Sequence, residues 1–247
     1  MARSLSTRGR FVLAYLVLGA AAGGVLGASI VLGKQPGPKP APPWSSWQPG
    51  SSSRNAEVLE IARHVGRSYR LASGVPLATV KVGSPEGIDL RAIGIPKTKQ
   101  PKTLGDFNLY EHDKSVVYAL CGDGSKNCYA RANVARGAVL RREALELALY
   151  TLKYAPVDNV LVFFPPASRK AKPELTVFLH RGDLEGRLEH PLRSTLPQAK
   201  PPLPGRITTL EQQTVDALTG SSIYRYLDTE TGPGYGNVLV LEPLAGA

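Results

Sequence analysis

The chain has few of the residues that most often carry chemistry, with two cysteines and four histidines among 247 residues. The histidines form neither His-x3-His nor His-Glu-x-x-His spacing, which argues against zinc. The sequence also lacks a Gly-x-Ser-x-Gly nucleophile elbow, a P-loop lysine and an Asp-x-Asp-x-Asp-Gly calcium loop. The glycine cluster at residues 232–236 is better explained by a hairpin turn than by a phosphate site. We therefore expect no cofactor and no bound metal.

Acidic residues are absent before Glu57, and residues 11–33 contain no charged residue at all. An apolar helix needs about 20 residues to cross the hydrocarbon core, and this run is long enough. Arg3, Arg8 and Arg10 precede it, and the positive-inside rule keeps such an end in the cytoplasm. The pattern predicts a single-pass signal anchor in the cell membrane, with the lipid bilayer as partner and an extracytoplasmic C-terminal domain.

A cleaved signal peptide is the main alternative, but its apolar core is usually only about 7–15 residues long. A lipoprotein is disfavoured because no cysteine follows the run. Within it, Gly19, Gly23 and Gly27 fall on nearly one helix face. Such small-residue stripes allow close helix packing in lipid. We expect this face to support self-association or contact with another membrane protein, although a plain glycine-rich anchor has the same pattern.

Proline, glycine and serine dominate residues 34–53, which indicates an extended spacer. Trp44 and Trp47 within it could rest on the lipid interface or cover the domain. The predicted organisation is a cytoplasmic tail at 1–10, a transmembrane helix at 11–33, a linker at 34–53 and one domain at 54–247. All 20 acidic residues and all but five of the 30 basic residues lie in that domain, whose net charge is therefore +5. Scattered charge of this size does not predict nucleic-acid binding.

Cys121 and Cys128 are the two cysteines, and a close pair outside the cytoplasm is expected to be oxidised. Six residues separate them, which suits a disulfide that closes a short turn. Redox chemistry prefers Cys-x-x-Cys, so a redox protein is a weaker alternative. We expect a structural staple, with a pinned functional loop as the other interpretation.

Hydrophobic periodicity predicts an α+β domain, in which one mixed, largely antiparallel sheet packs with about three helices. Helices are expected at 55–71, 140–154 and 208–218, the last with a capping box formed by Thr208 and Glu211. The run from the strand at 115–121 through the second helix to the all-apolar strand at 160–164 suggests a parallel crossover. The other expected strands are 77–82, 88–95, 108–110, 129–131, 175–179, 223–227 and 237–241.

The helix at 140–154 has the clearest pattern in the chain. Leu145, Ala148, Leu149 and Leu152 are expected to form its buried face. The charged residues between them are expected to mark its solvated side. These residues are Arg141, Arg142, Glu143, Glu146 and Lys153.

His180 is the best candidate for a catalytic group, because it ends a predicted strand and Asp183 follows closely enough to orient it. The sequence as a whole favours a membrane-anchored module for binding or envelope assembly. The alternative is an extracytoplasmic hydrolase acting on wall or envelope material. A deep polar cleft around His180 would favour the enzyme, and an apolar patch would favour the binding module.

Overall fold

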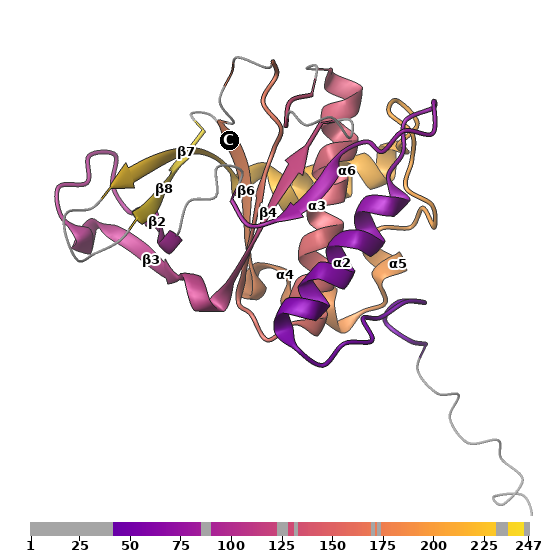
Figure 1. The fold of residues 1–247 in the computed structure, drawn as a ribbon, viewed down its shortest axis with the longest axis horizontal. Helices are drawn as coiled ribbons and strands as arrows, with labels where there is room; N and C mark the ends of the chain where they lie inside the picture. The colour runs from indigo at the N-terminus through magenta and orange to yellow at the C-terminus, as the bar shows by residue number, and fades with distance from the viewer. Residues whose placement is uncertain are drawn as a thin grey trace, which may run out of the picture. The chain divides into compact units, whose positions relative to one another are not determined.

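A mixed sheet with apolar side chains on both faces lies at the centre of the fold (Figure 1). We used a computed structural model, which describes residues 42–84, 90–122, 128–130, 133–168, 171, 174–230 and 237–244. The described residues form eight strands in the order β1-β4-β5-β6-β7-β8-β2-β3. Their bounds are β1 Thr79–Val82, β2 Leu90–Pro96, β3 Phe107–Glu111, β4 Ser115–Cys121, β5 Asn159–Phe163, β6 Leu175–His180, β7 Ile223–Glu230 and β8 Asn237–Pro243.

Most neighbouring strands run antiparallel, and the parallel pairs are β4 with β5 and β2 with β8. The parallel crossover predicted between β4 and β5 is confirmed, since helix α3 (Val134–Tyr154) connects them. Every residue of β5 is buried, as its continuous apolar sequence predicts for a strand covered on both faces. The mixed, largely antiparallel sheet of an α+β fold is therefore confirmed.

Helices cover one face of the central strands (Figure 1). They are α2 (Arg54–Ser68), α3, α4 (Arg181–Glu189), α5 (Leu192–Thr195) and α6 (Thr209–Thr219). Short 3-10 turns occur at Leu104–Asp106, His112–Lys114 and Gly220–Ser222. The estimate of about three helices was too low for the described chain, because α4 and α5 went unrecognised. The helix α4 contains two glycines and is anchored by only Leu184 and Leu188, so its apolar pattern is faint.

Side chains alternate between the two faces of each central strand, as period-two geometry requires. In β5, Val160 and Val162 enter the core beneath the helices, whereas Leu161 and Phe163 enter a second core on the opposite face. Residues of β2 and β8, such as Ile93 and Leu241, complete this second core. The central strands are therefore buried on both faces, and the second core consists of strand residues alone among the described residues.

A segment that we name the strap, residues 43–53, packs on the domain and belongs to the compact unit Pro43–Ala247. Trp44 contacts Tyr150 and Tyr154 edge-on, and Trp47 stacks on His64 with ring centroids 3.8 Å apart. The amide of Leu192 also donates to the Trp44 carbonyl at 2.7 Å. Two positions were expected for Trp44 and Trp47, and the structure shows the one in which they cover the domain.

Two further predictions concern a strand at residues 129–131 and a transmembrane helix at residues 11–33. The strand predicted at 129–131 as a hairpin partner is wrong for the described residues 129 and 130, because β1 and β5 already occupy both edges of β4. The predicted transmembrane segment at 11–33 lies outside the described residues. Within the described chain, no helix has the length and apolar character needed to span a membrane.

Candidate functional site

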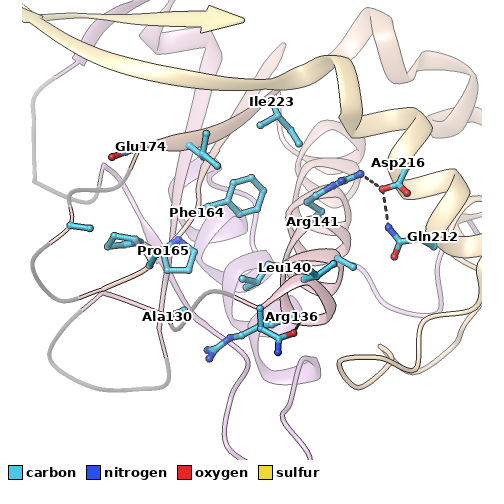
Figure 2. Close-up of a pocket in the computed structure, with 18 residues that line it drawn as sticks. Ala130, Arg136, Leu140, Arg141, Phe164, Pro165, Glu174, Gln212, Asp216 and Ile223 are labelled. Atoms are coloured by element: carbon cyan, nitrogen blue, oxygen red, sulfur yellow. Dashed lines mark hydrogen bonds and ion pairs between the residues drawn. The ribbon is translucent and has the colours of Figure 1, made fainter. Parts of the chain in front are cut away.

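A pocket of about 860 Å³ lies between the first half of α3, helix α6 and the connection from β5 to β6 (Figure 2). This volume is in the range of about 300–1,000 Å³ that is usual for small-molecule sites. Most of the lining side chains are apolar. They include Val134, Ala138, Leu140, Phe164, Pro165, Pro166, Ala167, Leu175 and Ile223.

The wall next to β5 follows from the sequence Phe164-Pro165-Pro166. Proline lacks an amide N–H and cannot continue a central strand, so β5 ends at Phe163 and the chain turns away from the sheet. Phe164 still donates its amide to the Leu175 carbonyl at 3.0 Å. This bond holds the start of the turn against β6 and keeps Phe164 in the pocket wall.

The predicted disulfide between Cys121 and Cys128 is present, with a Cα–Cα distance of 4.0 Å. The returning chain runs close against Gly122, where an added Cβ would lie 1.5 Å from the Tyr129 carbonyl oxygen. Ala130, which lines the pocket, then donates its amide to the Pro166 carbonyl at 2.9 Å. The staple therefore holds one wall of the pocket in place. Residues 123–127 of the closed loop lie outside the described chain.

Arg141 and Asp216 form an ion pair across the pocket between α3 and α6 (Figure 2). Gln212 donates to the same Asp216 oxygen at 2.8 Å, and Arg141 Nε donates to Thr219 Oγ1 at 3.2 Å. Both charges are part-exposed, so solvent weakens the pair. The charge of Arg141 is nevertheless compensated within the site.

Arg136 is the second cationic side chain among the residues that line the pocket, and no described acidic residue forms an ion pair with it. Its Nη2 donates to the Leu77 carbonyl at 2.6 Å, while its buried Nε has no acceptor within the described structure. Sequence analysis missed Arg136 because it predicted the helix to begin at residue 140. Asn133 was the available signal, since its side chain caps α3 by accepting the Arg136 amide.

A buried polar network lies beside the pocket and fastens α6 to α3. Arg142 donates to Glu211 Oε1 at 2.7 Å, to Glu146 Oε2 at 2.8 Å and to the Gln198 carbonyl at 3.0 Å. The hydroxyl of Tyr69 also accepts from Arg142. Arg142 and Glu211 are 1 % and 0 % exposed, so each depends on the other for compensation. The prediction that Arg142 lies on a solvated face is wrong.

Glu143, also predicted to be solvated, is 0 % exposed, and neither carboxyl oxygen has a hydrogen-bond partner in the described chain. Burial raises the pKa of Glu143 well above its ordinary value, and the charge of Glu146 raises it further. Arg136 and Arg142 oppose this shift without cancelling it. Burial therefore favours the neutral form of this carboxyl in the folded protein.

His180 lies at the far end of β6 from Leu175, so it is outside the pocket by about 17 Å of strand. Its Nδ1 pairs with Asn159 Oδ1 at 2.8 Å, and Asn159 Nδ2 donates to Ser115 Oγ at 3.3 Å. An amide oxygen only accepts, so this bond places the proton on Nδ1 and leaves Nε2 as the acceptor of the neutral ring. Asn159, rather than Asp183, orients the imidazole.

Asp183 is in the first turn of α4, and its charge is felt at Tyr224. Burial raises the pKa of Tyr224, and the neighbouring Tyr110 and Asp183 raise it further. The Tyr110 ring lies 6.0 Å from that of His180. The structure therefore places Asn159 and Tyr110 beside His180, but the described residues provide no activated serine or cysteine there.

The remaining predicted site residues, Gly19, Gly23 and Gly27, lie outside the described chain. The described residues contain no cluster of three or more histidine, cysteine or acidic side chains that could hold a metal ion. The chain matches none of the protein-family models, curated proteins or solved structures with which it was compared.

Proposed function

We propose that this chain is a single-pass membrane protein whose extracytoplasmic domain binds a small, largely apolar ligand and serves binding or envelope assembly. The observation that carries the proposal is the pocket between α3, α6 and the β5–β6 connection, which has apolar walls and a few polar groups. That composition is typical of ligand sites. The disulfide and the Arg142 network support it, because each fixes a wall of the pocket.

The position of the strap is compatible with such a role. Trp44 packs on Tyr150 and Tyr154, near the C-terminal end of α3, whereas the pocket is built on the first half of that helix. A helix of 21 residues is about 30 Å long at 1.5 Å per residue. The strap and the pocket therefore lie near opposite ends of α3.

Photoaffinity labelling of the full-length protein in lipid nanodiscs tests the pocket. A medium-chain alcohol carrying a diazirine should label peptides that contain Leu140 and Phe164. The variant Ala138→Trp fills the pocket and should abolish this labelling, whereas Ala199→Trp on an exposed loop should not. If Ala138→Trp does not fold, Ala167→Trp replaces it. Labelling spread evenly over the domain would contradict the proposal.

Membrane topology is tested separately in intact cells. A cysteine placed at the exposed Glu185 should react with a membrane-impermeant maleimide, and the protein should remain in the membrane after carbonate extraction. Reaction only after permeabilisation would place the domain in the cytoplasm and contradict the proposed orientation.

The association proposed for the glycine face rests on the sequence pattern of Gly19, Gly23 and Gly27. Crosslinking in the membrane should capture a second copy or a specific membrane protein. Replacement of all three glycines by leucine should remove that product. Equal capture by both forms would show that the face is not used.

The hydrolase remains the second candidate, and the observation in its favour is the Nδ1 bond between His180 and Asn159. This bond leaves Nε2 able to act as a general base. Hydrolytic activity on esters, amides or glycosides that is lost in His180→Gln but retained in His190→Gln would support an enzyme. Equal activity in both variants would remove His180 from consideration.

A further inference from the structure

Arg136 presents an uncompensated positive charge to the pocket. It lines the cavity, and among the described residues it makes no ion pair and its buried Nε has no acceptor. Within the same part of the chain, its Nη2 donates to the Leu77 carbonyl, which fixes the position of the guanidinium without neutralising it.

The other charges of the pocket do not compensate Arg136. Asp216 is engaged by Arg141 and Gln212 (Figure 2), and Glu174 is exposed to solvent, which screens its charge. Glu143 is the acidic residue that interacts electrostatically with Arg136. Burial, however, favours the neutral form of the Glu143 carboxyl. The positive charge of Arg136 is therefore available to a ligand.

The N-terminus of α3 adds positive potential on the same side, since Asn133 and Val134 also line the pocket. Most of the remaining wall is apolar, and its large side chains include Leu140, Phe164 and Ile223. A complementary ligand has an apolar body for these side chains and one anionic group for Arg136. A guanidinium binds a carboxylate in this way through charge-assisted hydrogen bonds.

We propose that the pocket binds an apolar carboxylate, with its carboxylate on Arg136 and its hydrocarbon part between α3, α6 and the Phe164 turn. This assignment rests on the proposed binding function and specifies the class of ligand. A cationic molecule of the same size would be repelled by Arg136, and a neutral one would gain no charge-assisted hydrogen bond from it.

The test compares three diazirine probes with the same alkyl chain, a carboxylate, an alcohol and an amine, on the full-length protein in nanodiscs of neutral lipid. Adducts are located by peptide mass spectrometry. The carboxylate should label the pocket peptides about tenfold more efficiently than the alcohol, and the amine should label them least. Arg136→Met should remove the preference for the carboxylate, and Arg136→Lys should retain part of it.

Arg193→Met is the matched control, because it removes the same charge from an exposed position on α5. It should leave the preference unchanged. Equal labelling of the pocket by all three probes would overturn the carboxylate assignment but leave the proposed binding function intact. Absence of pocket adducts with every probe would overturn both. The comparison among probes on the wild-type chain remains decisive even if Arg136→Met does not fold.

Discussion

Replacement of Glu143 by methionine should stabilise the protein, and the gain should grow with pH. Glu143 is fully buried in α3, and both of its oxygens lack partners in the described chain. Burial, reinforced by Glu146, raises its pKa, and Arg136 and Arg142 oppose the shift. Methionine has a similar length and no polar atoms, so it should fill the same space.

The expected magnitude has two parts. A buried polar group without partners costs about 1–3 kcal/mol, and Glu143→Met removes this cost. The second part comes from protonation, since the folded protein retains a proton that the unfolded chain releases above its ordinary pKa of 4.5. Wild-type stability from this group is therefore fully present below pH 4.5 and is lost as pH rises. Within the window between the two pKa values, the advantage of the variant should grow by up to about 1.4 kcal/mol per pH unit.

Urea unfolding of the full-length protein in non-ionic detergent, from pH 4 to 8, measures this difference. Fluorescence of Trp44 and Trp47 is a suitable signal, because both tryptophans pack against the helices of the domain. Glu185→Met is the control, since Glu185 is an exposed carboxylate on α4. A pH-independent difference, or destabilisation by Glu143→Met at neutral pH, would show that the Glu143 carboxyl is not held neutral by burial.

Three further changes have defined outcomes. Arg142→Met should destabilise the domain by about 3–5 kcal/mol in urea unfolding, because it leaves the buried Glu211 carboxyl without its cationic partner; a loss below about 1 kcal/mol would contradict the buried pair. Replacing Cys121 and Cys128 together by serine should cost about 2–3 kcal/mol and weaken labelling of the pocket; unchanged labelling would separate the staple from the site. Trp47→Ala should raise the pKa of His64, which burial lowers, and NMR titration would measure this rise; an unaltered His64 titration would contradict stacking of the strap.

Much of the sheet could be predicted because its signals are local. Strands β4 and β5 are mainly apolar sequences, and the helix between them is long enough to connect two parallel strands. The disulfide could also be predicted, since its two cysteines are close in sequence and the expected compartment is oxidising. Each of these inferences depends on residues within one segment of the chain.

The buried face predicted for α3 is confirmed at Leu145, Ala148, Leu149 and Leu152, but its solvated side could not be predicted in the same way. A charged residue in an amphipathic pattern normally indicates solvent, but α2, α4, α6 and β5 all pack around this helix. Arg142 is buried because Glu211, 69 residues further on, compensates it. Glu211 was expected to complete a capping box. Thr208 does accept the Glu211 amide at 3.4 Å, but the Glu211 side chain turns to Arg142 instead.

The pocket was beyond sequence reasoning for a similar reason. Its walls come from segments near Ala130, Arg136, Phe164, Asp216 and Ile223, and none of them carries a recognisable motif. His180 could be selected because it ends a strand, yet its orienting partner, Asn159, precedes it by 21 residues. Only the pairing of β5 with β6 places these two residues opposite each other.

Two adjacent arginines of α3 set the distance between α3 and α6. One of them does so from a buried network that does not line the pocket. Arg142 holds Glu211 in the first turn of α6, and Arg141 holds Asp216 further along the same helix. The distance between α3 and α6, and hence the width of the pocket, is therefore fixed at two points. The exposed pair is expected to contribute little energy, whereas the buried one cannot be broken without a large cost. Loss of Arg142 should for this reason disturb ligand binding more than loss of Arg141, although only Arg141 lines the pocket.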